Sequence, residues 1–218
     1  MHKALHTKLH RAWRSRARDF VLVPMPHIHS PTIQIKNVAF ENGVYRKAHL
    51  ELARIKNLDI VHSVMYPRPQ FDIPILGIDL VEFEGRPMFA IADTCPLTDD
   101  LSLPPHYLEL VRTLQNKHGI KPVARDEMPG WGQKIFSDMC IMTRDVPSNF
   151  VEYAIELVDI HMVYAALLEP SPDHARIRKN LARFSMYQLR NGKTKAALAM
   201  ELGLHEAETY MRTVMFDS

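Results

Sequence analysis

Hydrophobic and polar residues alternate in several short runs of the first half of the chain, which is the pattern of half-buried β-strands. The runs lie between residues 27 and 95, and Asn42-Gly43 and Glu84-Gly85 separate neighbouring runs as turn signals. A shorter run at 137–144 predicts a sixth strand. Because short turns join neighbouring strands in opposite directions, we expect an antiparallel sheet.

The second half of the chain has a helical period, with apolar residues recurring every three or four positions. Proline and glycine residues divide this half into segments, and each segment predicts one helix. These segments are 104–118, 148–170, 171–192, 193–204 and 205–216. Strands followed by helices predict an α+β fold, with helices packed on an antiparallel sheet. No internal repeat or linker interrupts the pattern, so residues 1–218 are expected to form one domain.

Another helical pattern opens the chain, where Leu5, Leu9 and Trp13 recur every four residues. The first twenty residues also contain six Lys or Arg residues and a single acid. They form either a basic helix that belongs to the domain or an organelle-targeting peptide. The spacing of the apolar residues favours the domain helix.

Composition and motifs argue against several classes of function. The net charge of +2 does not indicate a nucleic-acid-binding protein. Cys95 and Cys140 are far apart and form no CxxC motif or disulfide framework, which is typical of a reducing cytosolic compartment. The eight glycines form neither a GxGxxG motif nor a P-loop, so no nucleotide site is indicated. No apolar run approaches the ~20 residues that span a bilayer.

Ionisable side chains occupy the middle of three consecutive predicted strands. Alternation places Asp79 on a face with aliphatic residues that should point into a core. An ionised carboxylate there costs free energy unless it is paired, hydrogen-bonded or neutralised. If the strands are neighbours, His49, Glu51, His62 and Asp79 converge on one face. Alternation assigns to the same face Tyr45, Lys47, Ile73, Ile75 and Val81.

This cluster allows three interpretations. Each histidine alone is typical of a hydrogen-bonded core residue, and Asp79 alone could fix a loop through backbone amides. His, Glu and Asp are also good metal ligands, as in a metal-dependent hydrolase, although the chain has no HExxH or CxxC spacing. A buried carboxyl beside an imidazole can instead hold a proton and deliver it to a bound substrate.

Several ordered segments make the chain recognisable. "YRKAHLELA", "LDIVHSVMYPRPQFDIPILGIDLV" and "AIADTCP" closely resemble the ferredoxin-dependent bilin reductases, and their phycocyanobilin-forming branch most. The later segments "MPGWGQKIFSD", "HMVYAALLEP", "RNGKT" and "ETYMRTVMFD" resemble that family in the same order. The resemblance covers roughly residues 32–217, which is most of the chain.

The resemblance implies a three-layer α/β/α sandwich, with a central antiparallel sheet flanked by helices. It implies an oxidoreductase that binds biliverdin IXα between the sheet and the C-terminal helices and has no bound metal or organic cofactor. Electrons would arrive singly from a reduced [2Fe–2S] ferredoxin while the protein supplies protons, four electrons in all. The host would be photosynthetic, or infected by a virus that encodes the protein. A non-catalytic bilin or haem carrier is the alternative.

By the same resemblance, Asp79 is the proton donor beside the tetrapyrrole and His62 is its partner. Glu51 matches a glutamate that protonates the D-ring vinyl group, and His49 joins the proton network. The expected substrate-binding residues are Lys193 and Arg125 at the propionates, together with Asn191.

Gly192 departs from the family pattern, which often has an acid at this position for reduction at the A-ring end. The product is therefore either phycocyanobilin or phycoerythrobilin, the latter by first attack at the C15–C16 bridge.

Because ferredoxins are acidic, a basic docking surface is expected, and charge should steer the encounter. We expect a monomer that binds neither nucleic acid nor a membrane. The candidate docking residues are Lys3, Lys8, Arg11, Arg14, Arg16, Arg18 and Lys195.

Overall fold

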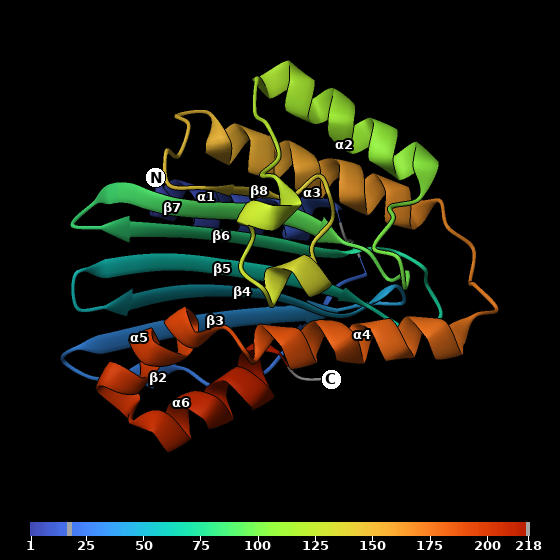
Figure 1. Ribbon diagram of the computed structural model, residues 1–218. Helices are drawn as coiled ribbons and strands as arrows, with labels where there is room; N and C mark the ends of the chain where they lie inside the picture. Colours follow the sequence, from blue (N-terminus) through green and yellow to red (C-terminus); the bar gives the residue numbers. More distant parts are fainter. Residues whose placement is uncertain (17–18, 217–218) are drawn as a thin grey trace.

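A central antiparallel sheet dominates the computed structural model, which describes residues 1–16 and 19–216 (Figure 1). Its strand order is β1-β3-β4-β5-β6-β7-β8, and β2 pairs with β3 beside this path. Every pair of neighbouring strands is antiparallel, as the short turns predict. The strands are β1 (Val21–Val23), β2 (Ile28–His29), β3 (Ile33–Glu41), β4 (Tyr45–Ile55), β5 (Leu58–Pro67), β6 (Ile75–Phe83), β7 (Arg86–Cys95) and β8 (Ile141–Thr143).

Tight turns fix the register of the long strands. Asn42 closes the β3–β4 hairpin, because its side-chain oxygen accepts from the backbone N–H groups of Val44 and Tyr45 at 2.9 and 2.7 Å. Glu84 and Gly85 join β6 to β7 with positive φ angles of 51° and 79°, as a two-residue hairpin turn requires. Both turns lie where the sequence predicts them.

One layer of helices, the back layer, consists of α1 (His2–Arg16), α2 (Pro105–His118) and α3 (Phe150–Ala166). Leu5, Leu9 and Trp13 of α1 are fully buried in a core that also contains residues of α3 and of the sheet. The helical stripe is therefore an internal face of the fold, and the prediction of a domain helix is confirmed for residues 2–16.

The front layer covers the opposite face of the sheet with α4 (His174–Gln188), α5 (Gly192–Leu202) and α6 (Leu204–Tyr210) (Figure 1). A π-helical turn, Met211–Met215, follows α6 directly. Apolar residues of this layer form a second core with strand residues such as Ile35, Ala53 and Tyr66. The predicted α/β/α sandwich is thus confirmed, with one hydrophobic core on each face of the sheet.

Three details differ from the sequence-based expectations. The sheet has eight strands rather than six, because β1 and β2 are short edge strands with little alternation. Tyr45 packs in the back core and not on the face of Lys47, since a register shift lies between these two residues. Ile73 precedes β6, so strand alternation does not apply to it, and it also joins the back core. Within the described residues, no helix is long and apolar enough to cross a bilayer.

Candidate functional site

A row of polar side chains crosses four neighbouring strands on the front face of the sheet. The strand register pairs Asn37 of β3 with Glu51 of β4, Glu51 with His62 of β5, and His62 with Asp79 of β6. Residues paired across antiparallel strands point to the same side of a sheet, so these side chains are direct neighbours. The convergence predicted for Glu51, His62 and Asp79 therefore follows from the pairing itself.

His62 and Asp79 form a hydrogen-bonded pair in this row, with Nδ1 of His62 2.7 Å from Oδ1 of Asp79. The imidazole is 8% exposed and the carboxylate 32% exposed. Burial lowers the pKa of His62, but the neighbouring carboxylates Asp79 and Glu51 raise it by more, so the pKa of His62 lies above its ordinary value. The pair therefore favours an imidazolium beside a carboxylate whose other side reaches solvent.

Glu51 lies deeper and is only 3% exposed. Its Oε2 accepts a hydrogen bond from the hydroxyl of Tyr210 at 2.6 Å. Burial raises the pKa of Glu51, while His62 and the Tyr210 hydrogen bond oppose that rise only in part. This carboxyl can accordingly hold a proton at a pH where an ordinary glutamate has lost it.

His49 lies beside the row, on the same face of β4 as Glu51. Its Nε2 is 2.9 Å from Oδ1 of Asn37, and its ring meets that of His62 edge to face with centroids 5.9 Å apart. Burial, followed by the charges of His62 and Lys47, holds the pKa of His49 well below its usual value. His49 is therefore a neutral imidazole.

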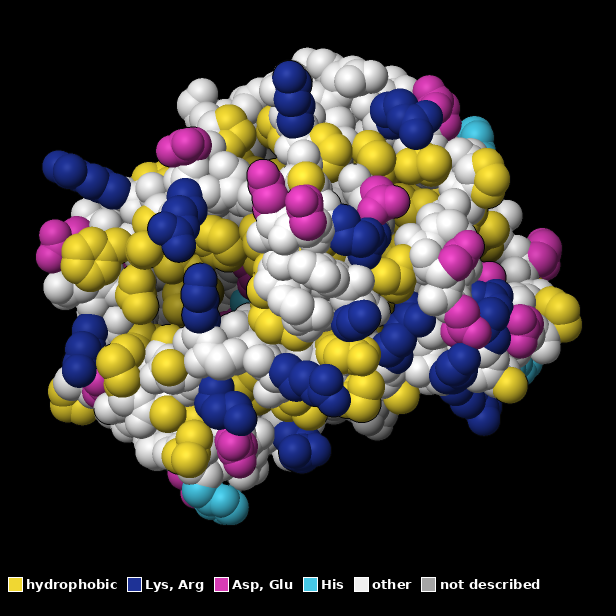
Figure 2. All heavy atoms as spheres, viewed as in Figure 1, with side chains coloured by type: hydrophobic (Ala, Val, Ile, Leu, Met, Phe, Trp, Pro, Cys, Tyr) yellow, Lys and Arg dark blue, Asp and Glu magenta, His cyan; other side chains and the backbone are white. Residues whose placement is uncertain are grey.

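The front layer leaves part of this face open around Asp79. Gly77, Val81 and Phe89 are only partly buried on the open face, and Phe83 at the end of β6 is 46% exposed. Figure 2 looks onto this side and shows a hollow left of centre, where hydrophobic side chains surround small areas of carboxylate and histidine. The expectation that Asp79 points into a core is wrong, because its carboxylate is 32% exposed and α4, α5 and α6 leave this part of β6 open (Figure 1).

The match to known proteins covers nearly the whole chain. Residues 25–217 match the family model described as ferredoxin-dependent bilin reductase. The chain belongs to this family. It is 35% identical over 195 residues to the phycocyanobilin:ferredoxin oxidoreductase of a Synechococcus strain, covering 85% of this chain and 76% of that protein. It is 37% identical over 200 residues to the enzyme of the same name from Gloeobacter violaceus, with coverages of 85% and 74%.

A solved structure is similar in fold to this family member. The phytochromobilin synthase from tomato, crystallised in complex with biliverdin, superposes with a TM-score of 0.77. The superposition covers 96% of this chain and 82% of that one, at 14% sequence identity. The two chains therefore share the same sandwich architecture.

The three residues expected to bind substrate lie outside the polar row. The side chain of Asn191 is the N-cap of α5, where Oδ1 accepts from the backbone N–H groups of Lys193 and Thr194 at 3.2 and 3.4 Å. Lys193 is exposed at the start of the same helix. Asn191 thus has a clear local role, and Lys193 presents its ammonium group to solvent.

Arg125 is held by its own loop. Its guanidinium contacts Oδ1 of Asp138 at 2.6 and 2.8 Å, and it also donates to the backbone oxygens of Gln133 and Phe136 at 2.9 and 3.1 Å. These bonds order the segment that follows α2 and engage most of the guanidinium donors. Arg125 therefore has few donors left for a ligand.

Two residues of the polar network were missed in the sequence. Asn37 is a neutral strand residue whose type gives no sign of chemistry, and Tyr210 lies in a helix far along the chain. The segment "ETYMRTVMFD" could have drawn attention to Tyr210, because its polar hydroxyl occurs among residues that the helical period assigns to the core.

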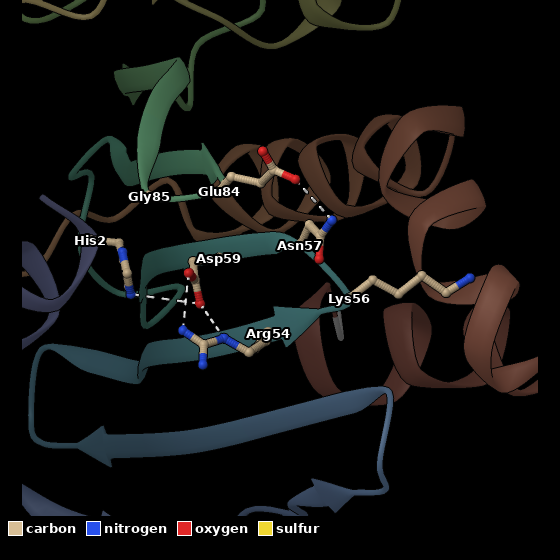
Figure 3. A pocket seen from close by; sticks show the side chains of 7 residues that line it. All are labelled: His2, Arg54, Lys56, Asn57, Asp59, Glu84 and Gly85. Atoms are coloured by element: carbon tan, nitrogen blue, oxygen red, sulfur yellow. Dashed lines mark hydrogen bonds and ion pairs between the residues drawn. The ribbon is translucent and has the colours of Figure 1, made fainter.

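A second hollow, of about 490 Å³, lies beside the β4–β5 and β6–β7 turns and is also lined by His2 of the back layer (Figure 3). Most of its polar groups already have partners: Arg54 donates to Asp59 at 2.7 Å, Asn57 donates to Glu84 at 3.2 Å, and Lys56 pairs with Glu201 at 2.8 Å. The hollow therefore offers no converging set of free polar groups among the described residues. In the described part of the chain, no three or more His, Cys, Asp or Glu side chains are arranged to hold a metal ion.

Proposed function

We propose that this chain reduces biliverdin IXα to a phycobilin, with reduced ferredoxin as the electron donor and its own side chains as proton donors. The observation that carries the proposal is the His62–Asp79 pair, which presents a carboxylate at an open, apolar-walled part of the sheet. The match to phycocyanobilin:ferredoxin oxidoreductases supports the choice of substrate. Apolar walls with a few convergent polar groups suit a large tetrapyrrole.

The reaction takes four electrons and four protons, in two stages. In each stage the bilin gains two electrons and two protons, and two [2Fe–2S] ferredoxins are oxidised. The Asp79–His62 pair protonates the bilin, and the resulting cation accepts the first electron to give a neutral radical. A second proton and a second electron then complete the stage. His62 suits this role because its raised pKa keeps a proton next to Asp79.

Glu51 serves the other stage as the donor to the D-ring vinyl group, with neutral His49 in the same proton network. Its raised pKa supports this role, since a carboxyl that retains its proton can donate it. The Glu51→Gln variant should therefore stop after two electrons and release a partly reduced bilin. An unchanged product profile would remove Glu51 from the mechanism.

Lys193 is our candidate for binding a substrate propionate through a charge-assisted hydrogen bond. Arg125 contributes mainly through the loop that it orders, and Asn191 by starting α5 next to Lys193. Gly192 supplies no acid at this helix start, so the product is phycocyanobilin or phycoerythrobilin according to which bond is reduced first.

Ferredoxin, in our proposal, docks on the front layer. The N-terminal candidates Lys3, Lys8, Arg11 and Arg14 lie on α1, on the opposite side of the sheet from Asp79; Arg18 and the side chain of Arg16 lie outside the described residues. Lys195 pairs with Glu208 at 2.8 Å. The exposed front-layer cations Arg178, Arg190 and Lys193 lie on the same side of the sheet as Asp79 and fit an acidic partner better.

The deciding experiment is an anaerobic incubation of biliverdin IXα with reduced ferredoxin and the protein, followed by absorbance and by chromatography of the products. We expect a reduced phycobilin from the native chain, and bound but unreduced pigment or a long-lived radical from Asp79→Asn. Binding of biliverdin without any reduction by the native chain would favour a bilin carrier. We place the reaction in the cytoplasm of a photosynthetic host, or of a cell infected by a virus that encodes the protein.

A further inference from the structure

Tyr210, the last residue of α6, reaches across the front core to the buried carboxyl of Glu51. The phenol is 6% exposed, and its oxygen lies 2.6 Å from Oε2 of Glu51. The same oxygen lies 2.9 Å from Nδ2 and 3.1 Å from Oδ1 of Asn37, the strand neighbour of Glu51. Tyr210 therefore contacts two members of the polar row from a different layer of the fold.

Asn37 determines the direction of these hydrogen bonds. Its Nδ2 donates to the backbone oxygen of Pro26 at 2.6 Å, and because a carbonyl oxygen only accepts, the amide nitrogen must face Pro26. The same nitrogen donates to the Tyr210 oxygen, so the phenol hydrogen is left for Glu51, which is also the closer acceptor. The Asn37 oxygen then accepts from Nε2–H of His49, which fixes the tautomer of that neutral ring.

The end of the chain holds Tyr210 in this position. In the turn that follows α6, the backbone oxygen of Val214 accepts from Nζ of Lys47 at 2.8 Å, and that of Met215 accepts from the hydroxyl of Tyr66 at 3.1 Å. Both donors lie on strands of the sheet. The phenol is thus presented to Glu51 by a segment that is fixed to two paired strand residues on one side of the polar row.

We propose that Tyr210 is a positioning residue that fixes the orientation of the Glu51 carboxyl and governs when that carboxyl gives up its proton. The inference rests on the proposed function of Glu51 as a proton donor. It adds a residue of α6 to the control of one reduction stage.

The groups that face Glu51 make the direction of the effect clear. His62 from β5 and the Tyr210 hydroxyl from α6 stabilise the ionised carboxylate, whereas burial and Asp79 from β6 destabilise it. His49 is neutral and contributes no charge. Removing the phenol hydroxyl takes away one of the two stabilising groups, so the carboxyl should keep its proton to a higher pH.

The test is Tyr210→Phe, with Tyr66→Phe as the matched control. Each change removes one buried hydroxyl that bonds between the sheet and the C-terminal segment, but only Tyr210 contacts Glu51. Infrared titration of the substrate-free protein reports the protonated Glu51 carboxyl, and Glu51→Gln assigns the band. We expect the Glu51 titration to move up by about one pH unit in Tyr210→Phe, and to stay in place in Tyr66→Phe.

An unmoved titration in a folded Tyr210→Phe protein, or an equal shift in both variants, would overturn the proposal. A double-mutant cycle gives a second readout, because Tyr210→Phe should change the product ratio in the native background and have no further effect in Glu51→Gln. Additive effects would mean that Tyr210 acts independently of Glu51. The infrared titration needs no turnover, so it still tests the inference if the native chain fails to reduce biliverdin.

Discussion

Replacing Asp79 with asparagine tests the electrostatics of the polar row most directly. Asparagine preserves the size of the side chain but removes the negative charge next to His62. In the native chain, Asp79 is the largest influence that keeps the His62 pKa above its ordinary value against burial. Without that charge, burial and Lys47 dominate over the remaining influence of Glu51, and the His62 pKa should fall.

The size of this fall can be worked from the contact. A hydrogen bond that involves a charged group contributes about 1.5–3 kcal/mol, and the 2.7 Å contact between His62 and Asp79 is of this kind. Because Asp79 is 32% exposed, solvent screens the pair, and the lower end, about 1.5 kcal/mol, applies. At about 1.4 kcal/mol for each pH unit, the His62 pKa should drop by about one unit.

The same pair makes the stability of the fold depend on pH. A histidine whose pKa is raised by folding stabilises the native state fully below its unfolded pKa, and the contribution is lost as pH rises through the folded value. Urea unfolding should therefore show Asp79→Asn less stable than the native chain by about 1.5 kcal/mol near pH 6, with a much smaller difference near pH 9.

A matched control is available on the surface. Asp99 pairs with Lys179 at 2.9 Å, and the two side chains are 59% and 66% exposed, so Asp99→Asn should change the stability much less than Asp79→Asn does near pH 6. NMR titration of the His62 ring checks the pKa directly. If the ring titrates at the same pH in the native chain and in Asp79→Asn, the reasoning about the pair is refuted.

Three further predictions concern other parts of the molecule. Leu9→Ala should lower the free energy of unfolding by about 2–5 kcal/mol, because Leu9 is fully buried, and a loss below about 1 kcal/mol in urea unfolding would contradict its place in the core. Burial raises the pKa of Asp93 to about 6, so ionisation of this carboxyl should lower the free energy of unfolding increasingly from about pH 4 to about pH 6. A midpoint near pH 4 for Asp93 in a ¹³C NMR titration would disprove the shift. Arg178→Glu should slow ferredoxin-dependent turnover at low salt more than Lys3→Glu does. A larger effect of Lys3→Glu would indicate that ferredoxin docks on the back layer.

Strand alternation predicted the positions of Glu51, His62 and Asp79 well, because the period of a strand and the register of a hairpin are local properties. It failed at Tyr45, where a bulge changes the phase of β4 without any mark in the sequence. The exposure of Asp79 could not be predicted, since it depends on where the front helices end over the sheet. Packing between layers decides this, and strand alternation carries no information about it.

The contact between Tyr210 and Glu51 joins residues 159 positions apart, and no periodicity reports such a pairing. Arg125 illustrates a different limit. Its residue type suits a propionate, but its own loop uses its donors, and a sequence does not reveal which partner an arginine has.

The irregularity in β4 has a consequence for how the chain tolerates changes of length. It reverses the side of the sheet on which the strand begins, so that Tyr45 fills the back core while Lys47, His49 and Glu51 face the front. Arg46 is the extra residue of this bulge, so deleting it would restore regular alternation and leave Tyr45 and Glu51 on the faces they now occupy. A one-residue deletion between Lys47 and Glu51 would instead turn one part of the strand over. A change of one residue in length is therefore tolerated at this bulge and not in the regular part of β4, where it would move Glu51 to the other face of the sheet.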